Sequence, residues 1–150
     1  MRVHLITAES PGSRRLRRGR LIQFPQLTMP LIAALTPREH HISHTDEIVE
    51  PVRFDAPADL VGITAPTPSA LHAYDLAREF RRRGVPVVIG GPHATALPEE
   101  AARHADAGVV GEAEDPWPRV LDDARHGKLE QVYVSTRQTP LAGKPAPRWG

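Results

Sequence analysis

Glycines and polar residues follow several apolar segments of this chain, and they are the residues best suited to contact a ligand. The apolar run Val87–Ile89 ends at Gly90 and Gly91. A glycine pair lets the backbone approach a large flat ligand, because no Cβ stands in the way. The segment 59–64 (DLVGIT) is followed by a loop with three hydroxyl residues, TAPTPSA, and residues 108–111 are followed by the carboxylates of GEAE. These loops offer bare backbone, hydroxyls and carboxylates to one ligand.

The candidate ligand-contacting residues come from these three loops. They are Thr64, Ala65, Thr67, Ser69, Gly90, Gly91, His93, Thr95, Gly111 and Glu112. Several also have purely structural interpretations. The glycine pair could form only a tight turn, and His93 could either contact a ligand or stabilise that turn. Glu112 and Glu114 could be an acid–base pair, although we favour hydrogen bonding to ligand or backbone for Glu112.

Histidines elsewhere in the chain do not form a convincing metal site. Alternation along a strand places His40 and His44 on a different face from His41, and no helical carboxylate–histidine spacing accompanies them. We therefore expect them to be surface residues of a strand.

Strands and helices are predicted to alternate along the chain and so to position these loops. Expected strands cover residues 3–7, 41–45, 59–64, 87–89 and 108–111. Expected helices cover 30–35 with Thr28 as a cap, 69–83 with Ser69 as a cap, a segment opened by Pro98, and a segment from Asp115 to near Gly127. The polar, arginine-rich segment 9–23 is expected to be a loop.

This alternation predicts an α/β fold, a doubly wound five-stranded parallel sheet of the flavodoxin-like (Rossmann-like) type. The polar segment 41–45 suits an edge strand, and the apolar segment 59–64 suits a central one. Ligands of such sheets bind at the carboxyl ends of the strands, where the three loops meet. Residues 1–134 would form this domain, and residues 135–150, with three prolines and two glycines, would form a linker or tail.

Composition excludes several classes of protein. The formal net charge of +1 gives no global attraction to nucleic acid or to an anionic membrane. No apolar run is long enough to span a membrane and no signal peptide is apparent, so a cytoplasmic location is expected. The absence of cysteine excludes disulfides, thiolate zinc sites and cysteine-ligated iron–sulfur clusters within this chain. Arg14, Arg15, Arg17, Arg18 and Arg20 concentrate positive charge in one segment, either a solvated loop or a contact for anionic groups.

The combination of loops resembles the cobalamin-binding domain at the amino end of cobalamin-dependent radical SAM enzymes. Those domains carry an ADLVGI(S/T) strand, a TP turn, a VVxGGxHxT turn and a GExE turn before an aromatic residue. Here the matching residues are Ala58–Thr64, Thr67 and Pro68, Val87–Thr95, and Gly111–Glu114 with Trp117 beyond. FPQLTMPLIAAL is similar to a further family segment, and the resemblance covers roughly Leu21 to Tyr133.

The resemblance implies how cobalamin would be held. The dimethylbenzimidazole tail would enter a pocket lined by the hydroxyl loop, the glycine pair and the GE turn, and the corrin would lie over the carboxyl edge of the sheet. The more distantly similar module of methionine synthase has a DxHxxG motif whose histidine ligates cobalt. The corresponding loop here, TAESPGSRRLRRGR, has no histidine. The resemblance therefore implies base-off cobalamin without a protein histidine ligand.

A second departure concerns catalysis. The CxxxCxxC motif that holds the iron–sulfur cluster of radical SAM enzymes is missing. The chain is therefore expected to carry cobalamin for a radical SAM domain or a separate partner, typically in methyl transfer, and not to catalyse alone. The alternatives are a flavodoxin-like small-molecule or nucleotide-binding enzyme and a degenerate interaction scaffold. The sequence contains neither GxGxxG after the first strand nor GxxxxGK[ST], so no phosphate-binding motif supports a nucleotide-binding enzyme.

Overall fold

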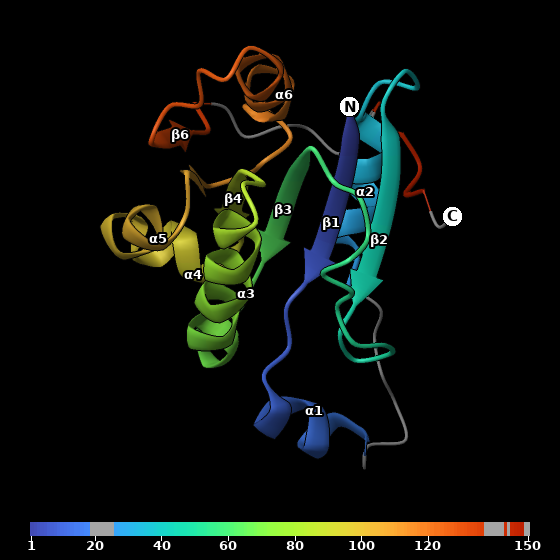
Figure 1. The fold of residues 1–150 in the computed structure, drawn as a ribbon, viewed down its shortest axis with the longest axis vertical. Helices are drawn as coiled ribbons and strands as arrows, with labels where there is room; N and C mark the ends of the chain where they lie inside the picture. The colour runs from blue at the N-terminus through green and yellow to red at the C-terminus, as the bar shows by residue number, and fades with distance from the viewer. Residues whose placement is uncertain (19–25, 137–142, 144, 149–150) are drawn as a thin grey trace.

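A parallel sheet forms the centre of the computed structural model, which describes residues 1–18, 26–136, 143 and 145–148 (Figure 1). Six strands are found within these residues, in the order β2-β1-β3-β4-β5-β6. They are β1 (Arg2–Thr7), β2 (His41–Asp46), β3 (Leu60–Thr64), β4 (Val87–Gly90), β5 (Ala107–Val110) and β6 (Val132–Val134). Every neighbouring pair is parallel. The doubly wound, flavodoxin-like architecture is thus confirmed.

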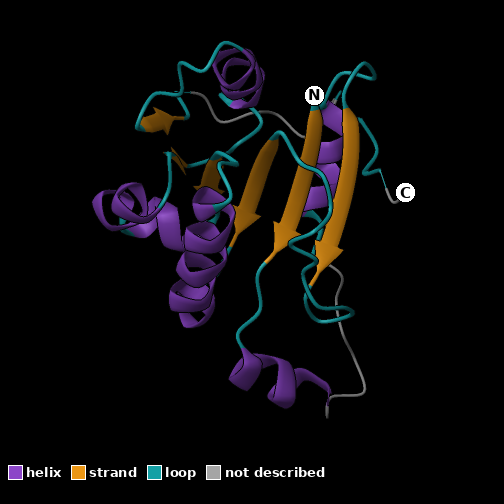
Figure 2. Ribbon diagram, viewed as in Figure 1, coloured by secondary structure: helices purple, strands orange, loops and turns teal. Residues whose placement is uncertain are grey.

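Helices cover both faces of the sheet (Figure 2). The described helices are α1 (Pro11–Arg18), α2 (Thr28–Leu35), the short 3-10 helix η1 (Thr67–Ser69), α3 (Ala70–Arg82), α4 (Pro92–Ala96), α5 (Pro98–His104) and α6 (Trp117–Arg125). Residues of α3, α4 and α5 pack with Ile63 and Ile89 on one face. Residues of α2 and α6 pack with Leu5 and Val88 on the other. None of the described helices is long and apolar enough to cross a membrane.

The two layers follow from the alternation of side chains along buried strands. Val87 and Ile89 face α3, whereas Val88, between them, faces α2 and α6. The positions of β2 at an edge and β3 inside the sheet confirm the expectations from their polarity. The predicted helix over residues 69–83 is also confirmed, with Ala73, Ala77 and Phe80 buried.

Three local expectations were wrong. The sheet has a sixth strand, β6, in a segment to which the sequence analysis assigned no element. The expected loop 9–23 contains α1 in its described part, because Pro11 suits a first helical position and arginine is a good helix former. The predicted turn after the glycine pair continues directly into α4 at Pro92. Residues 19–25, including Arg20 and the start of the matching segment at Leu21, lie outside the described residues, as do 137–142, 144, 149 and 150 of the tail.

Of the two predicted hydroxyl caps, Thr28 was wrong, and Ser69 occupies the cap position without the cap hydrogen bond. Thr28 is the first residue of α2, and Leu27 occupies the cap position without a side-chain hydrogen bond. Ser69 precedes α3, but its hydroxyl donates to a Glu9 carboxylate oxygen at 3.2 Å and makes no cap bond to α3.

Tyr133 shows why the short strand β6 is stable. Its side chain is fully buried, and its hydroxyl donates to Asp123 Oδ2 at 2.7 Å and accepts the Glu130 N–H at 2.9 Å. Burial and the hydrogen bond to Asp123 raise the pKa of Tyr133 to about 12. The phenol therefore stays protonated and links α6 to β6.

We predict that Tyr133→Phe lowers the free energy of unfolding by about 1–2 kcal/mol, because Asp123 and the Glu130 N–H each lose a partner. Urea denaturation followed by circular dichroism measures this change. An unchanged midpoint would mean that water replaces both hydrogen bonds without cost.

Candidate cofactor-binding site

The loops after β3, β4 and β5 meet at the carboxyl edge of the sheet. Thr64 and Gly90 are paired in register at the ends of β3 and β4. Beyond them, the Ala65 N–H donates to Gly90 O at 3.4 Å, and the His93 N–H donates to Ala65 O at 3.2 Å. The loop after β5 is joined in turn, because the Gly111 N–H donates to the Thr95 hydroxyl at 3.0 Å. The structure therefore connects the three loops that the sequence selected.

An open groove of about 670 Å³ lies along this edge. One wall is the start of α2, with Leu27 and Leu31, and the opposite wall comes from residues 91–96 and 111–114. Four predicted site residues line it, namely Gly91, Thr95, Gly111 and Glu112. The groove is mainly apolar, with carboxylates and a threonine hydroxyl along one side.

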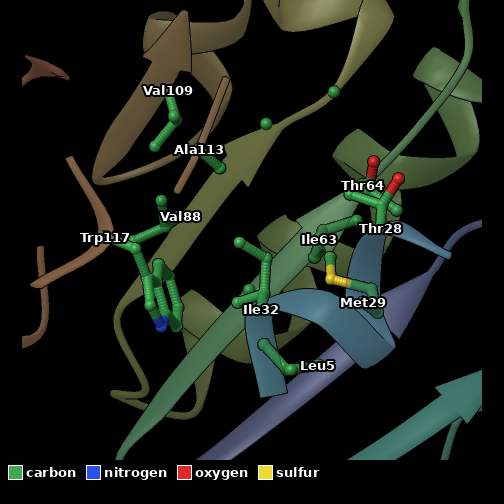
Figure 3. A pocket seen from close by; sticks show the side chains of 13 residues that line it. Leu5, Thr28, Met29, Ile32, Ile63, Thr64, Val88, Val109, Ala113 and Trp117 are labelled. Carbon is green, nitrogen blue, oxygen red and sulfur yellow. The ribbon is translucent and has the colours of Figure 1, made fainter. Parts of the chain in front are cut away.

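A narrow slot continues from the groove, between the sheet and helices α2 and α6 (Figure 3). Thr28, Ile32, Gly91 and Ala113 line both cavities, so the two adjoin. Met29 and Ile32 extend from α2 over the slot, and Trp117 and Val88 lie at its deeper part (Figure 3). The slot has a volume of about 30 Å³, enough for roughly one or two water molecules. Its walls are almost entirely apolar.

Glycines form the floor of the slot. Gly62, Gly90 and Gly91 line it, and Gly62 pairs with Val88 one layer deeper in the sheet than Thr64 and Gly90. A Cβ at Gly62 would lie 3.1 Å from Leu5 Cδ2 and 3.7 Å from the Trp117 ring. A Cβ at Gly91 would collide with the Thr64 hydroxyl. The space above the sheet thus depends on backbone without side chains.

Trp117 fixes the deep end of the slot. Its indole N–H donates to Thr36 Oγ1 at 2.8 Å, and the Thr36 hydroxyl donates to Ile32 O at 2.8 Å. Both side chains are buried. This chain of hydrogen bonds joins α6 to the carboxyl end of α2, and it leaves the indole N–H occupied.

Two hydroxyls stand at the slot. The Thr28 and Thr64 side chains both line the slot, Thr28 from the start of α2 and Thr64 from the end of β3 (Figure 3). Neither hydroxyl has a hydrogen-bond partner among the residues that the structure describes, although Thr64 is buried. Both hydroxyls are placed to bond polar atoms of a ligand in the slot.

Other predicted site residues support the loops and do not line either cavity. His93 is buried, with Nε2 2.8 Å from the Tyr74 hydroxyl and Nδ1 3.3 Å from Thr67 Oγ1. Burial is the main cause that raises the pKa of Tyr74 to about 12, and a hydrogen bond to Glu100 is the second cause. Ser69 is fully buried and accepts the Ser10 N–H at 3.1 Å. A direct ligand contact by any of these residues stays a prediction.

The deeper half of the site was not predicted from the sequence. Gly62, Met29 and Ile32 line the slot, whereas Trp117 was noted only for its place in the motif. A glycine within an apolar strand signals close approach by another group, so Gly62 could have been found. Met29 and Ile32 could not, because only the packing of α2 on the sheet brings them there.

A polar cluster beside β1 was also missed. Glu47 is buried; one carboxylate oxygen accepts the Glu9 N–H at 3.0 Å and lies 2.8 Å from His72 Nε2. The other accepts a hydrogen bond from Arg14 at 3.2 Å. The hydrogen bond to Glu47 is the main cause that raises the pKa of His72, and burial opposes it. The cluster joins the loop after β2 to α1 and α3.

The histidines of the β2 segment form no metal site in the part of the chain that the structure describes. His44 is exposed, with Nε2 3.1 Å from Thr7 Oγ1, and His41 is also exposed. His40 differs from the expectation of a surface position, because it is buried beside the amino terminus.

Comparison with known proteins agrees with this geometry. A family model described as the B12 binding domain matches residues 34–121, more than half of the chain. The chain belongs to the B12-binding domain family. This membership supports cobalamin as the ligand of the chain.

Related proteins carry the same region within longer chains. Bacteriochlorophyllide d C-8(2)-methyltransferase of Chlorobaculum tepidum is 43% identical over 116 residues, which are 77% of this chain and 26% of the relative. An uncharacterized methyltransferase of Pyrococcus horikoshii is 32% identical over 117 residues, or 69% of this chain and 26% of the relative. The chain thus spans about a quarter of the length of these relatives.

A solved structure supports the fold alone. The amino-terminal domain of a hypothetical protein of Thermotoga maritima superposes with a TM-score of 0.50 at 19% identity. The match covers 77% of this chain and 100% of that one.

We predict that Gly91→Ala destabilises the fold by about 2–3 kcal/mol, since φ +95° with ψ −170° is a backbone region open essentially to glycine alone. Gly84→Ala is the matched control. It also has a positive φ, of +77°, but no described atom lies within 4 Å of the added Cβ, so its cost should be only about 1 kcal/mol. Urea denaturation of both variants measures the difference, and equal costs would contradict the collision with Thr64.

The His72–Glu47 pair predicts a pH dependence of stability. Because the folded pKa of His72 is raised above 6.5, its stabilisation is complete below that pH and is lost as the pH rises through the folded pKa. The difference in unfolding free energy between the unmodified chain and His72→Gln should therefore shrink as the pH increases. In a Glu47→Gln background, the effect of His72→Gln on the unfolding free energy should no longer depend on pH. A pH dependence that persists would mean that His72 is stabilised by a partner other than Glu47.

Proposed function

We propose that this chain is a cobalamin-binding module in which the slot holds the dimethylbenzimidazole tail and the groove holds the corrin. The observation that carries the proposal is a glycine-floored apolar slot that opens into a much larger groove at the carboxyl edge of the sheet. Cobalamin matches these two shapes, because its tail ends in a flat aromatic group that suits the slot and its large corrin ring suits the groove. The family membership supports the same ligand.

The residues present fit such a tail if α2 moves outward. The slot of about 30 Å³ is narrower than an aromatic bicycle, whereas its floor is free of Cβ atoms. Met29 and Ile32 form the outer wall, and a methionine side chain readily adapts its shape. Thr28 and Thr64 would hydrogen-bond polar atoms of the tail at the entrance. Gly91, Thr95, Gly111 and Glu112 would contact the corrin side.

The proposed cofactor state is base-off, without a protein ligand from the loop after β1. That loop begins with Glu9 and Ser10, whose groups bond to Glu47 and Ser69. His93 is buried and already bonded on both ring nitrogens. These contacts support an arrangement in which the module binds and orients the cofactor and excludes water from its tail.

When bound, cobalamin would supply a cobalt centre that carries a methyl group. We propose that a radical SAM domain or a separate radical SAM protein uses this group, because relatives of about four times the aligned length are named methyltransferases. Residues 1–134 would be the binding unit, and residues 135–150 would lead toward the partner. In the described part of that tail, the Arg148 N–H donates to Pro30 O of α2 at 2.9 Å.

Titration with hydroxocobalamin, followed by desalting and ultraviolet–visible spectroscopy, tests the proposal. We expect retained corrin with a base-off spectrum. Gly91→Trp should weaken binding at least about tenfold, because a side chain at this position collides with Thr64, which lines the slot beside it. Gly84→Trp, at a positive φ in open space, is the control and should retain the corrin. No retention by the unmodified, folded chain would overturn the proposal.

A further inference from the structure

We infer that the slot selects cobalamin-type cofactors by the polarity of their lower base, favouring apolar aromatic bases over purines. This inference rests on the proposed function, and it concerns which member of the cofactor class the site accepts. Natural cofactors of this class differ in the aromatic base at the end of the nucleotide tail. The bases range from dimethylbenzimidazole and phenols to adenine.

Among the residues that the structure describes, none offers a free side-chain hydrogen-bonding group to a base buried in the deep part of the slot. The side chains of Leu5, Val88 and Val109 contribute only carbon atoms to the lining, and Gly62 presents strand backbone that is paired within the sheet. Trp117 lines the slot too, and its indole N–H is a possible donor. It is already bonded to Thr36 at 2.8 Å.

The two hydroxyls that have no partner within the described ranges are placed at the other end. Thr28 lines both the slot and the groove, and Thr64 lines the slot at the end of β3, beside Gly91, which lines both cavities. They can reach the sugar or phosphate part of a tail whose base is inserted more deeply. A base therefore passes them and enters an apolar environment.

The cost of burial distinguishes the bases. Adenine brings an amino group and ring nitrogens that lose water on entry, and the described lining gives them no partners. Each such loss weakens binding. A dimethylbenzimidazole or cresol ring instead buries carbon against Val88, Ile32 and the Trp117 ring, which is favourable.

The test compares two cofactors that are both base-off before they bind, so that displacement of the base from cobalt does not contribute. The unmodified chain is titrated with the p-cresol cobamide and with the adenine cobamide, and cobalamin is titrated in parallel. We expect the p-cresol form to bind at least about tenfold more tightly than the adenine form.

Equal affinities, or tighter binding of the adenine form, would overturn this inference while retained cobalamin still supports the proposed function. Failure of all three cofactors to bind a folded chain would overturn both.

Two neighbouring valines provide matched variants. Val88 faces the slot, whereas Val87 is equally buried on the opposite face of β4. Val88→Thr places a hydroxyl in the slot and should reduce the preference for the p-cresol form severalfold. Val87→Thr buries the same hydroxyl away from the slot and should leave the preference unchanged. An equal effect of both substitutions would assign the preference to general stability and contradict the inference.

Discussion

Close packing of α2 and α6 on the sheet leaves a slot only because three floor positions lack a Cβ. Side chains on a buried sheet face normally fill the space beneath a helix. At Gly62 and Gly91, added methyl groups would meet Leu5 and Thr64 at less than normal contact distance. The glycines therefore set the depth at which Met29, Ile32 and Trp117 can lie. The slot and its entrance follow from this constraint.

The parallel sheet determines where the open end of the slot lies. Because all strands run in the same direction, the loops after β3, β4 and β5 share one edge, although they are far apart in sequence. Hydrogen bonds between consecutive loops then fix their spacing, from Ala65 to His93 and from Thr95 to Gly111. Residues that do not line the cavities, such as His93, contribute by holding this edge in place.

The sequence was sufficient for features that depend on local pattern. The buried run Val87–Ile89, the amphipathic segment of α3 and the three edge loops predicted the sheet, its central strands and the groove. The sequence was insufficient for features that are determined by packing between segments far apart in the chain. The side chain of Met29 reaches the slot only through the docking of α2, and β6 is stabilised by the contacts of Tyr133 with α6. The cluster around Glu47 likewise joins three segments that no local pattern connects.

Chemistry along the carboxyl edge also explains why the cavity lies over β3, β4 and β5. In a doubly wound sheet, the crevice is expected where the strand order reverses, here between β1 and β3. Above β1, however, the buried Glu9 and Glu47 and the Ser69 hydroxyl satisfy one another through hydrogen bonds. Displacing them would leave buried charges without partners, at a high energetic cost. An apolar ligand therefore finds room only on the glycine-floored side of the switch point, where the side-chain groups that it displaces are apolar.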